Sequence, residues 1–185
     1  PITLTVVGTV TQVAGKIGNA ASVASGFNSL NGSGSKIASA TTYSLACWFQ
    51  KAGATNTVVM NIGGGDGIRL SISTSGIKLA NWQAFSENSY TKSVSLSQNT
   101  WYFLCGYYDG ANYALSVDGA SFTTGSASQA PGTNSTIDLA GDFSGSMIGI
   151  LDEFAFWKNH VLTDTEKNDL YNSGTGKTFN GSAWV

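Results

Sequence analysis

Hydrophobic and polar residues alternate along most of the chain, and this period of two predicts short β-strands. The alternation is cleanest in residues 43–50 (YSLACWFQ), 68–73 (IRLSIS) and 77–82 (IKLANW). Two Asp-Gly pairs, at 109–110 and 118–119, separate aromatic segments and predict tight hairpin turns. Short strands spaced by Gly, Asn and Ser turns indicate an all-β fold, a two-sheet antiparallel jelly-roll sandwich.

The most apolar segment covers residues 147–157 and predicts a strand that is buried on both faces. Strict alternation places Phe154 on one face and Leu151 on the other, and it sends Asp152 and Glu153 to opposite faces. At least one of these carboxylates therefore points among hydrophobic neighbours. A charge in that position needs hydrogen-bond donors or a metal ion.

One helix is expected after this strand. Thr163 and Glu166 have the spacing of a capping box, which marks a helix start. Leu170 and Tyr171 would lie on the inner face of the helix, and Gly174 would end it. The sandwich therefore carries one short C-terminal helix.

Length and composition indicate a single domain over residues 1–185. The chain has 23 Gly, only 2 Pro and 11% aromatic residues, which is typical of an all-β domain rather than a disordered chain. Residues 1–14 alternate weakly and are interpreted as an N-terminal arm or a first strand leading into the sandwich. The net charge of −2 gives no basic patch of the kind that binds nucleic acid. The sequence has no run of about 18 apolar residues, so it does not predict a membrane-spanning segment.

The two cysteines, Cys47 and Cys105, both lie inside predicted strands among aromatic residues. We interpret them as two buried thiols that pack as small hydrophobic groups, in preference to a disulfide. This interpretation leaves the redox compartment open.

Three segments resemble a known family. Residues 151–176 (LDEFAFWKNHVLTDTEKNDLYNSGTG) resemble the closing segment of laminin-G-like and pentraxin-like domains, with an Asp-Glu strand, a Leu-Thr turn and a helix ending in Leu-Tyr-Asn-x-Gly. Residues 15–20 (GKIGNA) resemble the opening of the laminin-G-like pattern, and residues 101–119 resemble its Asp-Gly hairpins. The chain is thus similar to the concanavalin A-like superfamily over nearly its whole length. The resemblance implies the same sandwich, with carbohydrate recognition as its function.

The residues that could carry catalysis do not form a recognisable set. His160 is the single histidine, and without an acidic partner nearby we expect it to be a surface residue. Glycosidases need two carboxylates that face each other across a cleft, whereas Asp152 and Glu153 diverge. Glu87 lies in a loop-like stretch, and Glu166 belongs to the capping box. We therefore predict that the chain is not an enzyme.

The resemblance also implies calcium as a cofactor. Pentraxin-like relatives bind calcium at one rim of the sandwich, and Asn56 and Asp142 match that pattern in residue type, which allows one ion but not two. Another kind of relative holds a structural calcium with an aspartate of the closing strand, and Asp152 matches it. The alternative is that Asp142 is a turn residue and Asp152 a hydrogen-bonded buried acid.

A carbohydrate site is predicted around Trp82, which alternation places on a solvent-facing side of its strand. Aromatic rings stack on the apolar faces of sugars, and amide or carboxylate groups pair with the hydroxyls. The alternative is that the aromatic residues pack in the core. The candidate ligand-binding residues are Trp82, Asn81, Gln83, Asp66 and Tyr90.

These observations favour a non-catalytic recognition or adhesion module that binds a carbohydrate or glycan surface and is assisted by calcium. The alternative function is a structural or decoration domain of an extracellular assembly, such as a phage virion or tail appendage, with partners in a homo-oligomer or a larger protein assembly. A hydrolase or lyase on the same fold is the weakest of the three hypotheses. The first two predict an extracellular, cell-surface or virion-surface location.

Overall fold

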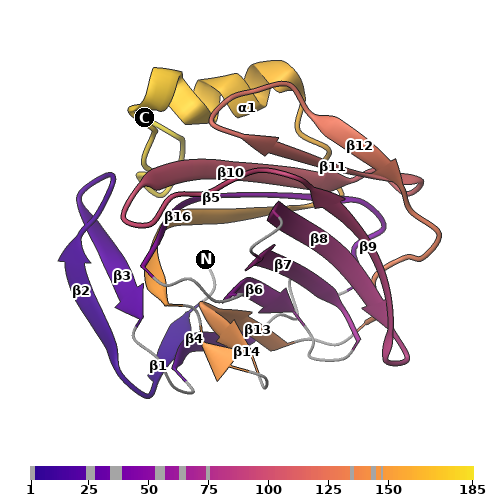
Figure 1. The fold of residues 1–185 in the computed structure, drawn as a ribbon, viewed down its shortest axis with the longest axis horizontal. Helices are drawn as coiled ribbons and strands as arrows, with labels where there is room; N and C mark the ends of the chain where they lie inside the picture. The colour runs from indigo at the N-terminus through magenta and orange to yellow at the C-terminus, as the bar shows by residue number, and fades with distance from the viewer. Residues whose placement is uncertain are drawn as a thin grey trace.

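The computed structural model describes residues 3–23, 28–33, 39–52, 57–62, 66–73, 76–133, 136–142, 145–146 and 148–185. In these residues, two seven-stranded antiparallel sheets pack face to face, and one short α-helix lies across the outer side of the second sheet (Figure 1). The predicted jelly-roll sandwich with one C-terminal helix is therefore confirmed.

The strands are distributed between sheet A and sheet B in an order that differs from the chain order. A small hairpin, β14 (Gly141–Asp142) with β15 (Gly145–Ser146), forms a separate two-stranded sheet. Sheet A has the order β1 (Leu4–Val7), β4 (Ser29–Ser33), β13 (Thr136–Leu139), β6 (Thr57–Ile62), β7 (Ile68–Ser73), β8 (Gly76–Gln83), β9 (Ser86–Lys92). Sheet B has the order β12 (Thr123–Ser126), β11 (Asn112–Val117), β10 (Trp101–Tyr108), β5 (Tyr43–Lys51), β16 (Gly149–Lys158), β3 (Asn19–Val23), β2 (Val10–Ala14).

The N-terminal segment contributes one edge strand to each sheet. β1 pairs with β4 at the end of sheet A, and β2 pairs with β3 at the end of sheet B. Gly8 lies between the two strands with a φ of 72°, a conformation that glycine adopts without a steric cost. The segment therefore connects the two layers along one side of the sandwich.

The main core lies between the two sheets and follows the predicted alternation. β5 points Tyr43, Leu45, Cys47 and Phe49 into it, and all four are fully buried. Sheet A faces them with the buried side chains Ile68, Leu70, Ile72, Ile77 and Leu79.

A second hydrophobic cluster lies on the outer side of sheet B, beneath α1 (Asp164–Tyr171). Trp48 and Phe103 are buried there, and Leu170 packs against them from the helix. The Tyr171 ring stacks on Trp48 with 5.8 Å between ring centroids. The inner helix face predicted from Leu170 and Tyr171 is confirmed, and it explains why Trp48 is a core residue.

The two cysteines are buried free thiols, as predicted. In the ladder between β5 and β10, Cys47 pairs with Leu104 while Cys105 pairs with Ala46. Cys47 therefore belongs to the main core and Cys105 to the second cluster, on opposite faces of sheet B. Burial raises the pKa of the Cys105 thiol to about 12, so both geometry and ionisation state disfavour a disulfide between them.

β16 contains a β-bulge that alternation did not predict. Its register with β5 shifts between Asp152 and Ala155, and Glu153 has a positive φ of 44°. The extra residue reverses the phase of the strand, so both Leu151 and Phe154 pack against the main core. The prediction that these two side chains lie on opposite faces is therefore wrong.

The bulge also places Asp152 and Glu153 on the same side of sheet B, which corrects the prediction that they diverge. Asp152 Oδ2 accepts a hydrogen bond from the Ile17 N–H (2.9 Å), and Asp152 Oδ1 accepts one from the Glu153 N–H (2.9 Å). Glu153 Oε1 accepts one from the Thr178 hydroxyl (2.8 Å). The two carboxylates thus anchor an N-terminal turn and a C-terminal segment to the same strand.

The helix begins with the predicted capping box. The Glu166 N–H donates to the Thr163 hydroxyl, and Glu166 Oε2 accepts from the Thr163 N–H. His160 is exposed as expected, but it does have an acidic partner, because its Nε2 lies 2.9 Å from Glu166 Oε1. Asn172 caps the other end in the left-handed conformation, and a 3-10 turn (Asn172–Gly174) follows. Neither α1 nor any other helix of the described ranges is long and apolar enough to cross a membrane.

Replacing Thr163 with alanine is expected to lower the free energy of unfolding by about 1 kcal/mol, because the Glu166 N–H at the helix start loses its side-chain acceptor. Urea denaturation of the two proteins measures the difference. Thr163→Ser is the matched control, since serine keeps the hydroxyl and should remain within a few tenths of a kcal/mol of wild type. An equal loss in both variants would contradict the capping role.

Candidate functional site

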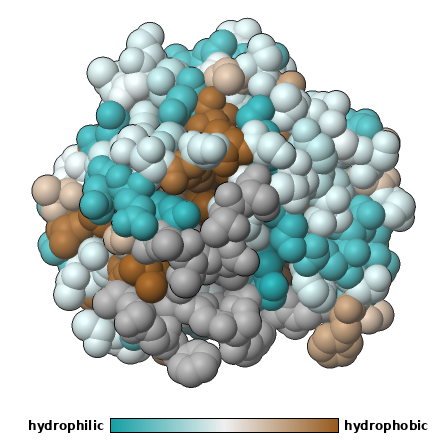
Figure 2. All heavy atoms as spheres, viewed as in Figure 1, coloured by the Kyte–Doolittle hydropathy of each residue, from teal (hydrophilic) through white to brown (hydrophobic). Residues whose placement is uncertain are grey.

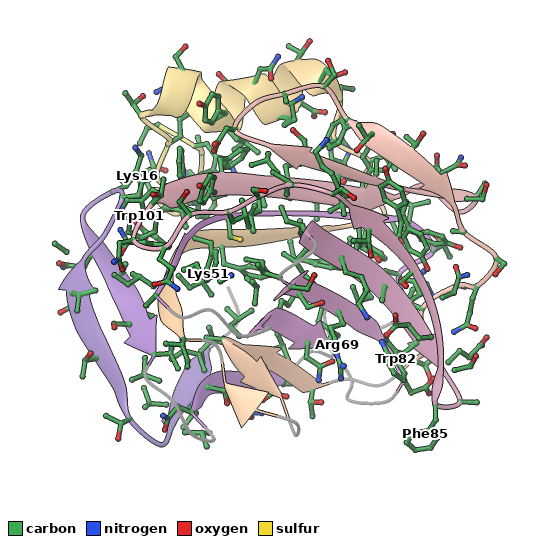
Figure 3. The ribbon with its side chains drawn as sticks, viewed as in Figure 1. Lys16, Lys51, Arg69, Trp82, Phe85 and Trp101 are labelled. Carbon is green, nitrogen blue, oxygen red and sulfur yellow. The ribbon has the colours of Figure 1, made fainter. Side chains whose placement is uncertain are left out.

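The outer side of sheet A carries a cluster of charged residues around one tryptophan, which we call the β7–β9 face: Arg69, Lys78, Trp82 and Glu87. Trp82 pairs directly with Glu87 across β8 and β9. Lys78 Nζ lies 2.8 Å from Glu87 Oε1, and the Arg69 guanidinium carbon lies 5.0 Å from the Trp82 ring centroid. Figure 3 shows Arg69 and Trp82 side by side at this corner of the sandwich.

The positive charges of the β7–β9 face stabilise the ionised form of Glu87. Partial burial alone would raise the pKa of Glu87, but hydrogen bonds from Lys78 and Ser89 and the charges of Lys78 and Arg69 outweigh it. The pKa of Glu87 therefore lies below its ordinary value, and the carboxylate stays ionised at neutral pH. The face presents fixed donors and a fixed acceptor on either side of an indole ring.

Trp82 is partly exposed, as the sequence predicted, and it does not belong to either hydrophobic cluster. The Arg69 guanidinium covers part of its ring in a cation–π contact. Its indole N–H is buried and has no hydrogen-bond acceptor among the described residues, and an unpaired buried donor carries a free-energy cost. A partly exposed ring with polar neighbours offers an apolar surface on which a sugar ring could stack.

Asn81 does not share this face, although it precedes Trp82 in sequence. Its side chain is fully buried between the sheets, where Oδ1 accepts from the Tyr43 hydroxyl (2.7 Å) and Nδ2 donates to the Gln129 carbonyl (2.8 Å). Its backbone N–H donates to the Tyr113 hydroxyl (3.2 Å). Asn81 is therefore buried, and its hydrogen bonds to Tyr43 and Tyr113 link the two sheets.

The other predicted ligand residues are also dispersed. Tyr90 pairs with Leu79 and packs against the main core, on the opposite side of β9 from Glu87. Gln83 is exposed at the end of β8. Asp66 Oδ1 accepts from the Ala84 N–H (3.1 Å) and so supports the β8–β9 turn. The structure brings none of these three onto the face that holds Trp82 with Arg69.

Sequence reasoning missed Arg69 and Glu87. Glu87 was assigned to a loop-like stretch, but it lies in β9 and is the direct cross-strand partner of Trp82. The signal was available in the hairpin register, because a two-residue turn at 84–85 pairs residue 82 with residue 87. Arg69 follows from the neighbouring β7–β8 ladder, where it pairs with Ala80 on the outer side of β8.

A row of polar side chains continues the β7–β9 face across the middle of sheet A. The register aligns Asn31, Asp138 and Asn61 with Arg69 on four neighbouring strands. Asn31 Nδ2 donates to Asp138 Oδ1 (2.7 Å). Asn61 is fully buried, and within the part of the chain that the structure describes neither its amide nitrogen nor its amide oxygen has a hydrogen-bond partner.

The predicted calcium ligands are described only in part. Asn56 lies outside the described residues, as does the side chain of Asp142, whose backbone belongs to β14. Asp152 is buried, and each of its oxygens accepts a backbone N–H, with the Gly15 backbone packed against one of them. This arrangement favours the hydrogen-bonded buried acid over a calcium ligand. Within the described residues, no group of three or more His, Cys, Asp or Glu side chains could hold a metal ion.

A small hydrophobic pocket lies under the C-terminal segment, on the outer side of sheet B. Trp48, Phe103, Trp157 and Trp184 line it together with Glu153. Trp157 and Trp184 lie 6.0 Å apart between ring centroids, and most of the lining belongs to the second cluster. The packing of this region makes it a secondary core beneath the helix.

Several solved structures share this fold at low sequence identity. Domain 4 of AbnA, a GH43 extracellular arabinanase from Geobacillus stearothermophilus solved with arabinotriose, has a TM-score of 0.71 and 20% identity, over 88% of this chain and 81% of that domain. The binding domain of botulinum neurotoxin DC in complex with SialylT has a TM-score of 0.71 and 14% identity, over 93% of this chain and 46% of that one. The binding domain of Paraclostridial Mosquitocidal Protein 1 has a TM-score of 0.70 and 15% identity, over 92% and 47%. The chain thus spans about half the length of the toxin binding domains it matches.

Among curated proteins, no sequence match was found. Residues 22–166 match the family model described as the concanavalin A-like lectin/glucanases superfamily, and this segment is most of the chain. It includes the strands from β4 to β16 and the start of the helix, and it begins near the end of β3. The family match, together with the sandwich topology, shows that the chain belongs to the concanavalin A-like lectin/glucanase superfamily.

Proposed function

We propose that this chain is a non-catalytic carbohydrate-recognition module that binds an extracellular glycan through the β7–β9 face. The observation that carries the proposal is Trp82, a partly exposed ring held by Arg69 and flanked by the Lys78–Glu87 ion pair. The indole supplies an apolar surface for a sugar ring, and the charged groups supply donors and an acceptor for its hydroxyls.

Two kinds of structural neighbour support the same ligand class. AbnA domain 4 was solved with arabinotriose, and it belongs to an extracellular arabinanase. Cell entry of botulinum neurotoxin type C is dependent upon interaction with two ganglioside molecules. These are properties of those proteins, and they make arabino-oligosaccharides and sialylated ganglioside oligosaccharides the first probes to use with this chain.

Trp82→Ala is expected to weaken oligosaccharide binding by about 30-fold, because losing a stacked aromatic ring removes about 2 kcal/mol of binding free energy. The measurement is a screen of arabino- and sialylated oligosaccharides on immobilised wild-type protein, followed by calorimetric titration of the oligosaccharides that bind. Trp82→Phe should retain most of the affinity, since a smaller ring still stacks.

Trp101→Ala is the matched control, because Trp101 is another partly exposed tryptophan but lies on sheet B. The Trp101→Ala variant should bind the same oligosaccharides with the affinity of wild type. Binding that survives Trp82→Ala would move the glycan site away from the β7–β9 face. If wild type binds none of the probes and instead self-associates in ultracentrifugation, a structural role in a larger assembly becomes the better hypothesis.

Calcium assistance is part of the proposal and rests on Asp142 and Asn56, whose residue types match the rim pattern of pentraxin-like relatives. Thermal unfolding in EDTA and in millimolar calcium tests it. A ligand specific to the folded state adds about 2.7 kcal/mol at a hundredfold excess over its dissociation constant. A midpoint shift that disappears in Asp142→Asn would support calcium at the rim, and identical midpoints would exclude it.

A further inference from the structure

The β8–β9 hairpin, which carries Trp82, ends in an unusual turn. Gln83 pairs with Ser86, so the turn consists of Ala84 and Phe85 alone. Both have left-handed backbones, with φ of 49° and 62°. Positive φ at both central residues is the geometry of a type I′ turn, in which Asn-Gly is strongly preferred and Ala-Phe carries a steric cost.

Phe85 gains no packing in return for that cost. Its side chain is 86% exposed, the highest value for any large hydrophobic residue in the described part of the chain. Figure 3 shows it projecting from the tip of the hairpin, at the same corner as Arg69 and Trp82. In Figure 2, this corner shows a hydrophobic side chain that protrudes beside a hydrophilic surface.

Hydrogen bonds fix the base of the turn, although its tip is exposed to solvent. Asp66 Oδ1 accepts from the Ala84 N–H (3.1 Å), and Gln129 Nε2 donates to the Ser86 carbonyl (2.9 Å). The Gly132 N–H donates to the Trp82 carbonyl (3.0 Å). These bonds from two other segments fix the hairpin end, so the Phe85 ring is presented with its backbone already ordered. A preordered group loses less entropy when it binds.

Strained backbone persists where the surrounding structure over-determines it, and such positions concentrate at functional sites. Here the strain, the exposure and the fixed base all serve to hold one aromatic ring in solvent next to Trp82. Trp82 lies within β8, whereas Phe85 lies beyond the end of that strand, at the tip of the turn. A glycan that contacts both rings is therefore expected to place a different sugar unit on each.

We infer that Phe85 is a second aromatic contact of the glycan, and that the ligand class is an extended oligosaccharide instead of a terminal monosaccharide. This inference rests on the proposed carbohydrate function of the β7–β9 face. Trp82 binds one sugar ring, and Phe85 binds a neighbouring unit of the same chain. Asp66 is then a positioning residue, because it fixes the turn without facing the ligand.

Phe85→Gly separates binding from folding. Glycine removes the ring and relieves the left-handed strain, so the unfolding midpoint should stay equal to that of wild type or rise by about 2 °C. Binding of arabino- and sialylated trisaccharides, measured by calorimetric titration, should weaken by about tenfold. Binding of the corresponding monosaccharides should not change. Phe85→Asn, which also tolerates the left-handed conformation, should behave in the same way.

Two control variants test whether the effect on binding comes from the Phe85 ring itself. Ala84→Gly relieves strain in the same turn but keeps Phe85, and it should bind like wild type. Phe179→Ala removes another exposed phenylalanine, which packs on Trp184 in the C-terminal segment, and it should also bind like wild type. Unchanged trisaccharide affinity in Phe85→Gly, combined with lost affinity in Trp82→Ala, would overturn this inference and leave the proposed function standing. A wild-type protein that binds none of the oligosaccharides would overturn both.

Discussion

Replacing Asn81 with leucine is expected to lower the free energy of unfolding by about 3 kcal/mol, one of the two largest effects anticipated for this fold. The change leaves the fully buried Tyr43 hydroxyl without its acceptor and the partly buried Gln129 carbonyl without its donor. An orphaned buried polar group costs about 1–3 kcal/mol. Urea denaturation of wild type and variant measures the loss.

Tyr43→Phe is the informative partner of Asn81→Leu. It removes the hydroxyl that donates to Asn81, so the double variant no longer contains the orphaned hydroxyl. We therefore expect the double variant to lose at least 1 kcal/mol less than the sum of the single variants, as a double-mutant cycle reports for a direct contact. Strict additivity would show that the two side chains do not interact in solution.

Asp152→Asn is expected to lower the free energy of unfolding by about 2–3 kcal/mol, equally in EDTA and in calcium. Both carboxylate oxygens accept backbone N–H groups at a buried site, and asparagine offers one acceptor and places an NH₂ group against the other donor. Urea denaturation in the two buffers measures the loss and its dependence on calcium.

Glu153→Gln is the control for the same bulge. The glutamine oxygen can still accept from the Thr178 hydroxyl, so the loss should stay below about 1 kcal/mol. The contrary result would be that calcium raises the free energy of unfolding of wild type but not of Asp152→Asn. That result would show that the Asp152 carboxylate binds the ion, and it would contradict the hydrogen-bonded arrangement described above.

Alternation predicted the fold well where strands are regular. β5 and the β7–β8 pair bury the residues that a period of two assigns to the core, and the capping box starts the helix where expected. It failed at β16, because one inserted residue at Asp152 and Glu153 changes the phase of everything that follows. A bulge is a tertiary compromise with the neighbouring strands, and no local pattern in this segment announces it.

The candidate site was only partly predictable for a related reason. Trp82 lies on the outer side of its strand, as alternation required, but Asn81 was grouped with it through adjacency in sequence. Neighbours along a strand point to opposite faces, so Asn81 had to face the core. Arg69 and Glu87 reach Trp82 through strand pairing: Glu87 through the β8–β9 register set by the turn at 84–85, and Arg69 through the β7–β8 register. Neither pairing is visible in one segment alone.

The position of β16 has a consequence for how the chain matures. This strand lies between β5 and β3 in the middle of sheet B, although it follows all the other strands in sequence. Until residues 149–158 leave the ribosome, β5 and β3 have no common neighbour, and the Ile17 turn has no carboxylate to bind. Contacts between such distant segments form slowly and leave hydrophobic strand edges exposed in the meantime. Synthesis of β16 is therefore the step that closes the sandwich, and a nascent chain stalled before it would be a substrate for chaperones.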